Sequence, residues 1–77
     1  MTEFKLDMSV DCLGLYCPEP IYRTRRALDE LEKGEILEVK ADDPAAEPDI
    51  RNLVNRLGYE IISVEREGDT VTILIRK

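Results

Sequence analysis

The stretch Asp11-Cys12-Leu13-Gly14-Leu15-Tyr16-Cys17-Pro18-Glu19-Pro20 marks the point where a predicted strand gives way to a predicted helix. Pro18 and Pro20 each lack an N–H group and fix their own φ, so neither fits a strand ladder or the interior of a helix. Proline is favoured in the first helical turn, where the N–H groups have no intrahelical partner. We therefore expect Pro18 at the first helical position and Cys17 as the N-cap.

Cys17 is the candidate nucleophile of this chain. Unpaired N–H groups and the positive end of the helix dipole stabilise an anion, which lowers the pKa of a cysteine and raises its thiolate fraction. The alternative is a buried, unreactive cysteine, as free cysteines often are. Because Cys17 is flanked by Pro18 and Glu19 and lies off the apolar stripe of the predicted helix, we expect it to be exposed and functional.

Charged side chains follow Cys17 along the predicted helix. Glu19 either acts near the thiol or simply complements the helix dipole, and its charge close to the sulfur opposes a fall in the cysteine pKa. Arg23 and Arg26 form either a solvated helix face or a docking patch. Arg25 lies at the flank of the apolar stripe, and we expect it to contact a partner or to fix the loop.

Cys12, five positions before Cys17, has three possible roles. It is a buried small residue, a resolving thiol that forms a disulfide with Cys17, or a metal ligand. Two cysteines in a chain without histidine would need a second chain to complete a zinc site. We favour burial, because Cys12 ends a predicted strand near the core.

Composition narrows the functional classes. The chain has 77 residues, a net charge of −6 and no histidine. Nucleic-acid binding draws much of its affinity from cations that neutralise phosphates, so we expect a protein partner and no direct contact with nucleic acid. The missing histidine removes the usual general base and mixed Cys/His zinc sites. We expect no metal and no cofactor.

Length and hydropathy predict one small domain over residues 1–77. No segment approaches the run of about 20 apolar residues that a membrane helix needs. We therefore expect no membrane partner and a cytoplasmic location. In that reducing compartment, two cysteines are more often free, reactive or metal-binding than joined in a structural bridge.

Hydrophobic spacing predicts the first half of the fold. Alternation predicts a strand over 4–10, followed by a tight loop over 11–16 in which Gly14 takes a positive φ or lets the backbone pass close to a neighbour. Spacings of three and four between apolar residues then predict a helix that Gly34 ends. A second strand is predicted over 35–41.

The second half begins with Asp42 and Asp43, which we expect to cap a helix entrance. That helix is predicted to begin near Glu47 and to end at Gly58. Two β-rich runs then follow, divided by a short turn of hairpin type at Gly68-Asp69. They cover residues 59–67 and 70–77.

The order β-α-β-α-β-β predicts an α+β fold. Both helices would cover one face of a four-stranded mixed sheet, which makes a two-layer α/β sandwich. The last two strands would form an antiparallel pair, and both β-α-β connections are expected to be right-handed.

With these elements in place, the chain resembles the TusA-like (SirA-like) family of sulfur-carrier proteins over nearly its whole length. The most specific part is Gly14-Leu15-Tyr16-Cys17-Pro18-Glu19-Pro20 after a predicted strand. Two positions depart from the family pattern: Glu47-Pro48 replaces a frequent Thr-Arg pair, and Cys12 replaces a small residue without a thiol. Further matches are Asp11, Leu13, Arg25, Gly34-Glu35, Ala41-Asp42-Asp43-Pro44-Ala45, Asp49-Ile50 and Gly58.

The resemblance implies a sheet order of 1-2-4-3 and a sulfurtransferase that works as a persulfide relay. Cys17 would be the active residue, with Pro18, Glu19, Pro20, Gly14 and Arg25 as its support. It would accept persulfide sulfur from a cysteine desulfurase or a rhodanese-like donor and pass it to an acceptor protein. Members of the family serve tRNA thiolation, molybdenum-cofactor assembly or sulfur oxidation.

Two alternatives from other functional classes stay open. The chain would be a thiol-redox module if Cys12 and Cys17 worked as a dithiol pair. It would be a non-catalytic interaction module if Cys17 reacted no faster than an ordinary thiol.

Overall fold

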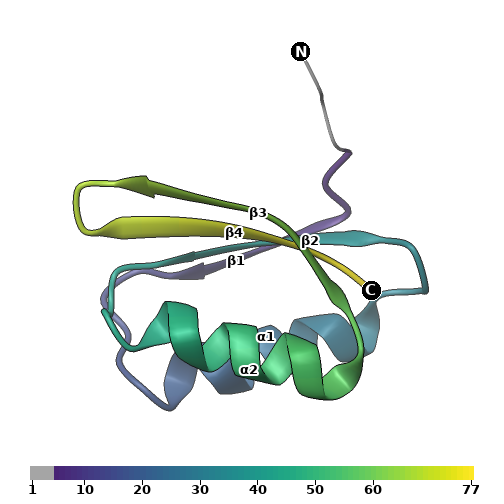
Figure 1. Ribbon diagram of the computed structural model, residues 1–77, viewed down its shortest axis with the longest axis horizontal. Helices are drawn as coiled ribbons and strands as arrows, with labels where there is room; N and C mark the ends of the chain where they lie inside the picture. The colour runs from purple at the N-terminus through teal and green to yellow at the C-terminus, as the bar shows by residue number, and fades with distance from the viewer. Residues whose placement is uncertain (1–4) are drawn as a thin grey trace.

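The computed structural model describes residues 5–77, and its elements follow the predicted order β-α-β-α-β-β. Strands and helices succeed one another as the ribbon changes colour from purple to yellow (Figure 1). The elements are β1 (Met8–Cys12), α1 (Glu19–Glu30), β2 (Ile36–Ala41), α2 (Ala46–Leu57), β3 (Glu60–Glu67) and β4 (Thr70–Arg76).

The four strands form one mixed sheet in the order β1-β2-β4-β3. β1 runs parallel to β2, while β4 runs antiparallel to both β2 and β3. Both helices cover the same face of this sheet (Figure 1). The predicted two-layer α+β sandwich and its sheet order of 1-2-4-3 are confirmed.

The core fills the space between the helices and the sheet. Alternate residues of β2 and β4 point into it, as expected for strands with one covered face. From the helices, the core takes residues spaced three and four apart. The buried cluster consists of Cys12, Ala27, Leu28, Leu31, Leu37, Val39, Ala41, Ala46, Ile50, Val54, Val71, Ile73 and Ile75.

β1 differs from the predicted strand over 4–10, of which residue 4 lies outside the described part of the chain. The strand begins at Met8 and continues through Cys12, so the predicted loop over 11–16 was wrong in its first two residues. Pairing with β2 explains the shift. Met8 lies opposite Leu37 and Cys12 opposite Ala41, so β1 extends as far as β2 offers partners.

The end of α1 was also predicted wrongly. The helix stops at Glu30, and Leu31 already has extended backbone with ψ 156°. The Lys77 ammonium donates to the carbonyls of Leu28 and Leu31 at 2.6 and 2.8 Å, which satisfies acceptors that a longer helix would have used. Gly34 lies in the turn before β2 instead, where it has a positive φ of 92°.

The second half agrees closely with its prediction. α2 begins at Ala46, one residue before the expected start, and its last residue is Leu57. Gly58 follows as the C-cap, and its φ of 79° is the left-handed conformation typical of a helix C-terminus. β3 and β4 form the expected hairpin. Neither α1 nor α2 is long and apolar enough to cross a membrane.

Candidate functional site

The segment between β1 and α1, residues 13–18, carries Cys17 and is defined here as the thiol loop. Backbone bonds shape both of its ends: the Leu15 N–H donates to the Cys12 carbonyl at 3.1 Å, and the Glu19 N–H to the Tyr16 carbonyl at 2.9 Å. Gly14 has a φ of 78°, which a residue with a Cβ adopts only with strain. The loop therefore turns sharply at the position where the sequence offers a glycine.

Carboxylates from the β2–α2 connection hold the thiol loop in place. The Gly14 N–H donates to Asp42 Oδ1 at 3.0 Å, and the Cys17 N–H donates to Asp43 Oδ2 at 2.8 Å. The other oxygen of Asp43 accepts the Ala45 N–H at 3.1 Å. The expectation that Asp42 and Asp43 cap this helix was wrong, because the N-cap of α2 is Ala45 and no side chain caps it. The two aspartates instead join the β2–α2 connection to the thiol loop.

This bridging role was missed in the sequence, although a signal for it was present. Neighbouring parallel strands end at the same edge of a sheet. The segments that follow β1 and β2 therefore lie side by side at that edge. The pairing of Cys12 with Ala41 places the thiol loop beside Asp42 and Asp43. From that register, the sequence could have predicted that the carboxylates of Asp42 and Asp43 face the backbone N–H groups of the thiol loop.

The expectation that Cys17 is the N-cap of α1 was wrong. α1 begins at Glu19, its N-cap is Pro18, and no side chain caps it. The early N–H groups instead find backbone acceptors, with the Tyr22 N–H donating to the Pro18 carbonyl at 3.2 Å. The peptide bond between Cys17 and Pro18 is cis. Cys17 therefore lies one residue outside the position at which a helix N-terminus would act on its sulfur most directly.

The Cys17 side chain is exposed and unbridged, as predicted, but its pKa shifts against the prediction. The pKa of the thiol is raised from its ordinary value, first by a hydrogen bond to the Asp49 carboxylate and then by slight desolvation and the charges of Asp49 and Asp43. These carboxylates favour the protonated thiol, so the local field of the α2 entrance opposes a thiolate.

Cys12 is fully buried at the end of β1 and is also a free cysteine. Burial raises the pKa of its thiol, and the Asp11 and Glu19 charges raise it further, while Arg23 acts in the opposite direction. Of the three roles considered, the structure places Cys12 as a buried small residue. Within residues 5–77, no group of three or more Cys, Asp or Glu side chains is arranged to hold a metal ion.

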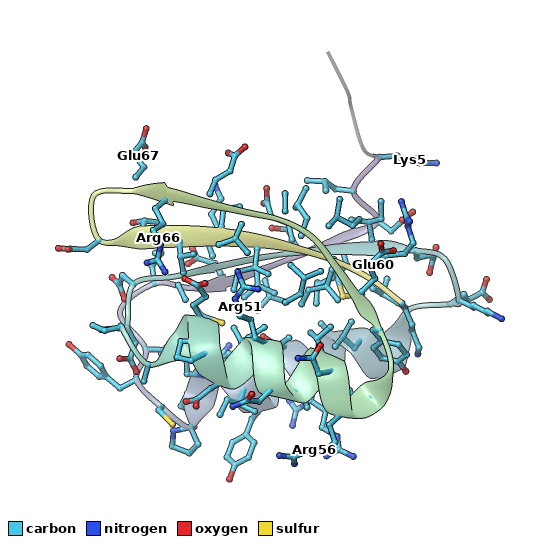
Figure 2. All side chains as sticks on the ribbon, viewed as in Figure 1. Lys5, Arg51, Arg56, Glu60, Arg66 and Glu67 are labelled. Atoms are coloured by element: carbon cyan, nitrogen blue, oxygen red, sulfur yellow. The ribbon has the colours of Figure 1, made fainter. Side chains whose placement is uncertain are left out.

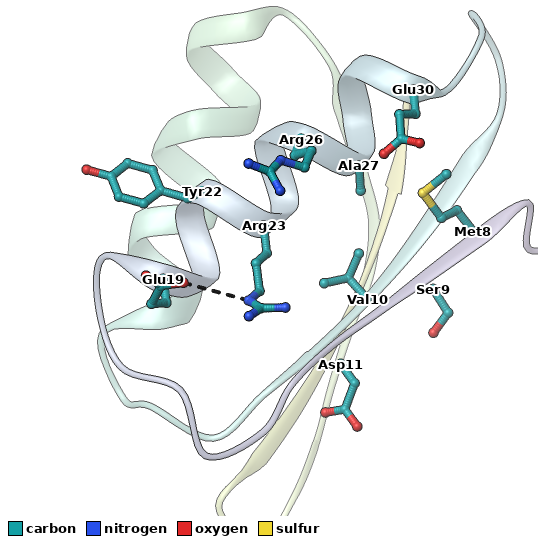
Figure 3. Close-up of a pocket in the computed structure, with 10 residues that line it drawn as sticks. All are labelled: Met8, Ser9, Val10, Asp11, Glu19, Tyr22, Arg23, Arg26, Ala27 and Glu30. Atoms are coloured by element: carbon teal, nitrogen blue, oxygen red, sulfur yellow. Dashed lines mark ion pairs between the residues drawn. The ribbon is translucent and has the colours of Figure 1, made fainter.

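The other predicted site residues divide between the surface and the core. Pro18 and Glu19 are exposed beside Cys17, whereas Pro20 is buried under the first turn of α1. Glu19 approaches Arg23, with 3.7 Å between Oε2 and Nε (Figure 3). Arg25 is exposed. Within residues 5–77, it forms no hydrogen bond or ion pair with the thiol loop.

A groove of about 510 Å³ runs between β1 and α1, but it does not contain Cys17. Figure 3 shows its charged lining, which includes Asp11, Arg26 and Glu30. The cysteine lies instead on open surface together with Tyr16, which is 72% exposed. Tyr22, one turn into α1, is 62% exposed and Leu13 is 43% exposed. An exposed thiol with large apolar side chains nearby in the chain suits contact with another protein.

Comparisons with known proteins agree with this arrangement. The family model described as "Sulfurtransferase TusA" matches residues 8–77. A candidate sulfur carrier protein of Archaeoglobus fulgidus is 54% identical over 68 residues, which cover 88% of each chain. The candidate sulfur carrier protein YrkI of Bacillus subtilis is 41% identical over 73 residues, covering 95% of this chain and 97% of that one.

A solved structure shares the fold. The crystal structure of a SirA-like protein from Desulfitobacterium hafniense superposes with a TM-score of 0.80 at 27% identity, covering 90% of this chain and 95% of the other. The β1–α1 segment with Cys17 falls within the span that the family model matches. Sequence, fold and family match therefore agree, and the chain belongs to the TusA sulfurtransferase family.

Proposed function

We propose that this protein is a sulfur carrier whose Cys17 accepts a persulfide sulfur from one protein and delivers it to another. The observation that supports this most directly is the exposed, unbridged Cys17 on a loop held by Asp43. A carrier cysteine must be reachable by two different partners, and exposure at a strand-to-helix connection meets that requirement. Membership in the TusA family adds the chemistry of sulfur transfer.

The transfer follows the pattern of thiol–disulfide exchange. The Cys17 thiolate attacks the terminal sulfur of a persulfide on the donor. A new S–S bond forms on Cys17, the S–S bond of the donor breaks, and the donor cysteine leaves with the electron pair and takes up a proton. The reverse sequence of events then moves the same sulfur from Cys17 to an acceptor thiol, with no net oxidation in either step.

The partners in this proposal are proteins. The donor is a cysteine desulfurase or a rhodanese-like protein, and the acceptor belongs to tRNA thiolation, molybdenum-cofactor assembly or sulfur oxidation. Tyr16, Tyr22 and Leu13 are the exposed apolar side chains that we expect to contact them, because tyrosine is enriched at the energetic centres of interfaces. Exposed Arg25 is a further expected contact. Two free cysteines suit a reducing compartment such as the cytosol.

Intact-mass measurement after incubation with a cysteine desulfurase and cysteine tests the proposal. We expect the protein to gain about 32 Da, the mass of one sulfur atom carried as a persulfide. The gain should disappear in Cys17→Ser and persist in the matched variant Cys12→Ser, because only Cys17 is accessible. If that donor gives no gain, the same three proteins are incubated with a rhodanese-like donor.

Two results would overturn the proposal. Full sulfur loading of Cys17→Ser would show that Cys17 is not the carrier. A reversible loss of about 2 Da on mild oxidation that required both cysteines would indicate a dithiol redox module instead.

A further inference from the structure

The groove between β1 and α1 follows a free edge of the sheet. Within residues 5–77, β1 pairs with β2 on one side and with no strand on the other. Four consecutive residues of β1, 8–11, line the groove, so the groove runs along the edge of the strand and not along one of its faces. Backbone N–H and C=O groups on such an edge have no partner strand and form a template for one more strand.

The two edges of the sheet differ in how they are protected. Bulges and charged side chains keep an edge strand from pairing with another chain. β1 keeps an unbroken register with β2 from Met8 to Cys12, and its one charged residue is Asp11. At the other edge, β3 has a register shift between Ile61 and Ser63. Its charged residues, three of them labelled in Figure 2, are Glu60, Glu65, Arg66 and Glu67.

α1 forms the second wall of the groove. Its lining residues fall at positions i, i+3, i+4, i+7, i+8 and i+11, which place them on one face of the helix. At the rise of an α-helix this face is about 16 Å long, the length of an extended segment of about five residues. The lining residues are Glu19, Tyr22, Arg23, Arg26, Ala27 and Glu30.

The charges along the groove change sign between its ends and its middle. Asp11 and Glu19 lie at the end next to the thiol loop, and Glu30 lies at the other end (Figure 3). Arg23 and Arg26 lie between them, and the Arg23 side chain extends from α1 toward β1. Glu19 approaches Arg23 at 3.7 Å with both side chains more than half exposed, and within residues 5–77 Arg26 forms no ion pair. The middle of the groove therefore favours a negative side chain.

The groove also offers apolar contact, from Val10, Ala27 and the ring of Tyr22. A second copy of this chain fits its charges poorly. Pairing two β1 edges about a two-fold axis sets the two α1 helices antiparallel. In the centred register arginines then meet arginines and glutamates meet glutamates, and like charges in such contacts are unfavourable. A different protein is the better occupant.

We propose that an extended segment of a protein partner adds to the free edge of β1 as a fifth strand, with an acidic side chain in its middle facing Arg23 and Arg26. Side chains two positions before and after the acidic one share its face of the strand and pack against the apolar contacts of the groove. Because β1 leads directly into the thiol loop, the bound segment lies next to the loop that carries Cys17. This inference concerns how a partner is held, which goes beyond the proposed sulfur chemistry.

A synthetic peptide tests the proposal without any sulfur transfer. The probe is acetyl-Val-Thr-Glu-Thr-Val-amide, whose two valines and glutamate share one face when it is extended. In a nuclear magnetic resonance titration of the ¹⁵N-labelled protein, we expect saturable shifts of the backbone signals of residues 8–11 and of the Arg23 and Arg26 side chains. The same peptide with lysine in place of glutamate should bind about 5-fold more weakly, the upper range for an exposed pair of charges.

Added strands have a second signature, in the backbone of the peptide. Successive N–H groups of a strand point to opposite edges. Methylating the nitrogen of the central glutamate and methylating the nitrogens of both threonines therefore block opposite edges. We expect one of these two peptides to lose binding and the other to keep it. Equal effects of the two methylations would overturn the addition of a strand.

A charge reversal in the protein tests the role of the arginines. In Arg26→Glu, we expect the preference between the glutamate and lysine peptides to be reversed. The matched control is Arg56→Glu, the same change in the last turn of α2, where the side chain points away from the sheet (Figure 2). The control should keep the preference of the wild type. An unchanged preference in a folded Arg26→Glu would overturn the predicted acidic contact.

The remaining outcomes separate the inference from the proposed function. If the glutamate peptide causes no saturable shifts, or shifts only outside β1 and α1, the inference is overturned, while a gain of sulfur mass on Cys17 still supports the carrier. If the signals of residues 8–11 shift on raising the protein concentration alone, a second copy occupies the edge and the inference is again overturned. If the peptide binds as expected but Cys17 takes no sulfur from either class of donor, the carrier function fails and the inference stands.

Discussion

Cys12 and Cys17 are the same residue type only five positions apart, yet the fold gives them opposite environments. Cys12 ends β1 inside the core with no exposed surface, and Cys17 lies on the open thiol loop. Both thiols have a raised pKa, but for different reasons. Burial is the main cause for Cys12, whereas the carboxylates of Asp49 and Asp43 dominate for Cys17.

This difference shows that a raised pKa by itself does not mark a cysteine as inert. Burial removes Cys12 from every reagent and partner at once. Carboxylates leave Cys17 accessible and only shift the balance between its charged and uncharged forms. A change at one aspartate can therefore alter Cys17 chemistry, while Cys12 becomes reactive only when the fold opens.

The largest expected effect is on alkylation. In the native protein, iodoacetamide should modify Cys17 and leave Cys12 protected, with a rate ratio of at least about 100, because Cys12 reacts only through opening of the core. Peptide mapping after partial alkylation measures the two rates. In 8 M urea the ratio should approach one, since burial is lost. Comparable native rates would contradict the assigned burial of Cys12.

The second effect is on stability. Cys12→Ser places a hydroxyl group in a fully buried position among apolar neighbours, so we expect a loss of about 1–3 kcal/mol in the free energy of unfolding. The matched change Cys17→Ser, at an exposed position, should alter it by less than about 0.5 kcal/mol. Urea denaturation followed by circular dichroism gives both values. Equal losses would show that the two sites are not packed differently.

The smallest effect is the response of stability to alkaline pH. Because burial raises the Cys12 pKa in the folded protein, the unfolded chain releases this proton at lower pH than the folded one. The contribution of Cys12 to stability is therefore fully present below the unfolded pKa, near 8.5, and is lost as pH rises through the folded pKa. We expect the melting temperature to fall less between pH 8 and 10 when Cys12 is replaced.

The comparison is made in a background that lacks the other thiol. Cys17→Ser and the double variant Cys12→Ala, Cys17→Ser differ in one titrating group only. The double variant should show the shallower fall in melting temperature, whatever its absolute stability. An identical slope in the two proteins would mean that the Cys12 pKa is the same in the folded and unfolded chains.

Much of the fold follows from local pattern in this chain. Spacings of three and four place Ile50, Leu53, Val54 and Leu57 along one side of α2, and Gly58 ends that helix as expected. In β4, burial alternates as the period of a strand with one covered face requires, with Val71, Ile73 and Ile75 on the buried side. Boundaries that depend on distant partners were harder to predict. β1 extends to Cys12 because β2 pairs with it, and α1 stops early where Lys77, from the other end of the chain, bonds its last carbonyls.

The site divides in the same way. The sequence by itself determined that Cys17 stands at a strand-to-helix connection flanked by prolines, off every apolar stripe, and therefore exposed. Only the tertiary structure decided what surrounds its sulfur. Asp42, Asp43 and Asp49 are at least 25 positions away in the chain, and the parallel pairing of β1 with β2 brings them to the thiol loop. Periodicity and turn preferences act over a few neighbouring residues, whereas the charge that a thiol meets depends on which distant segments the sheet places beside it.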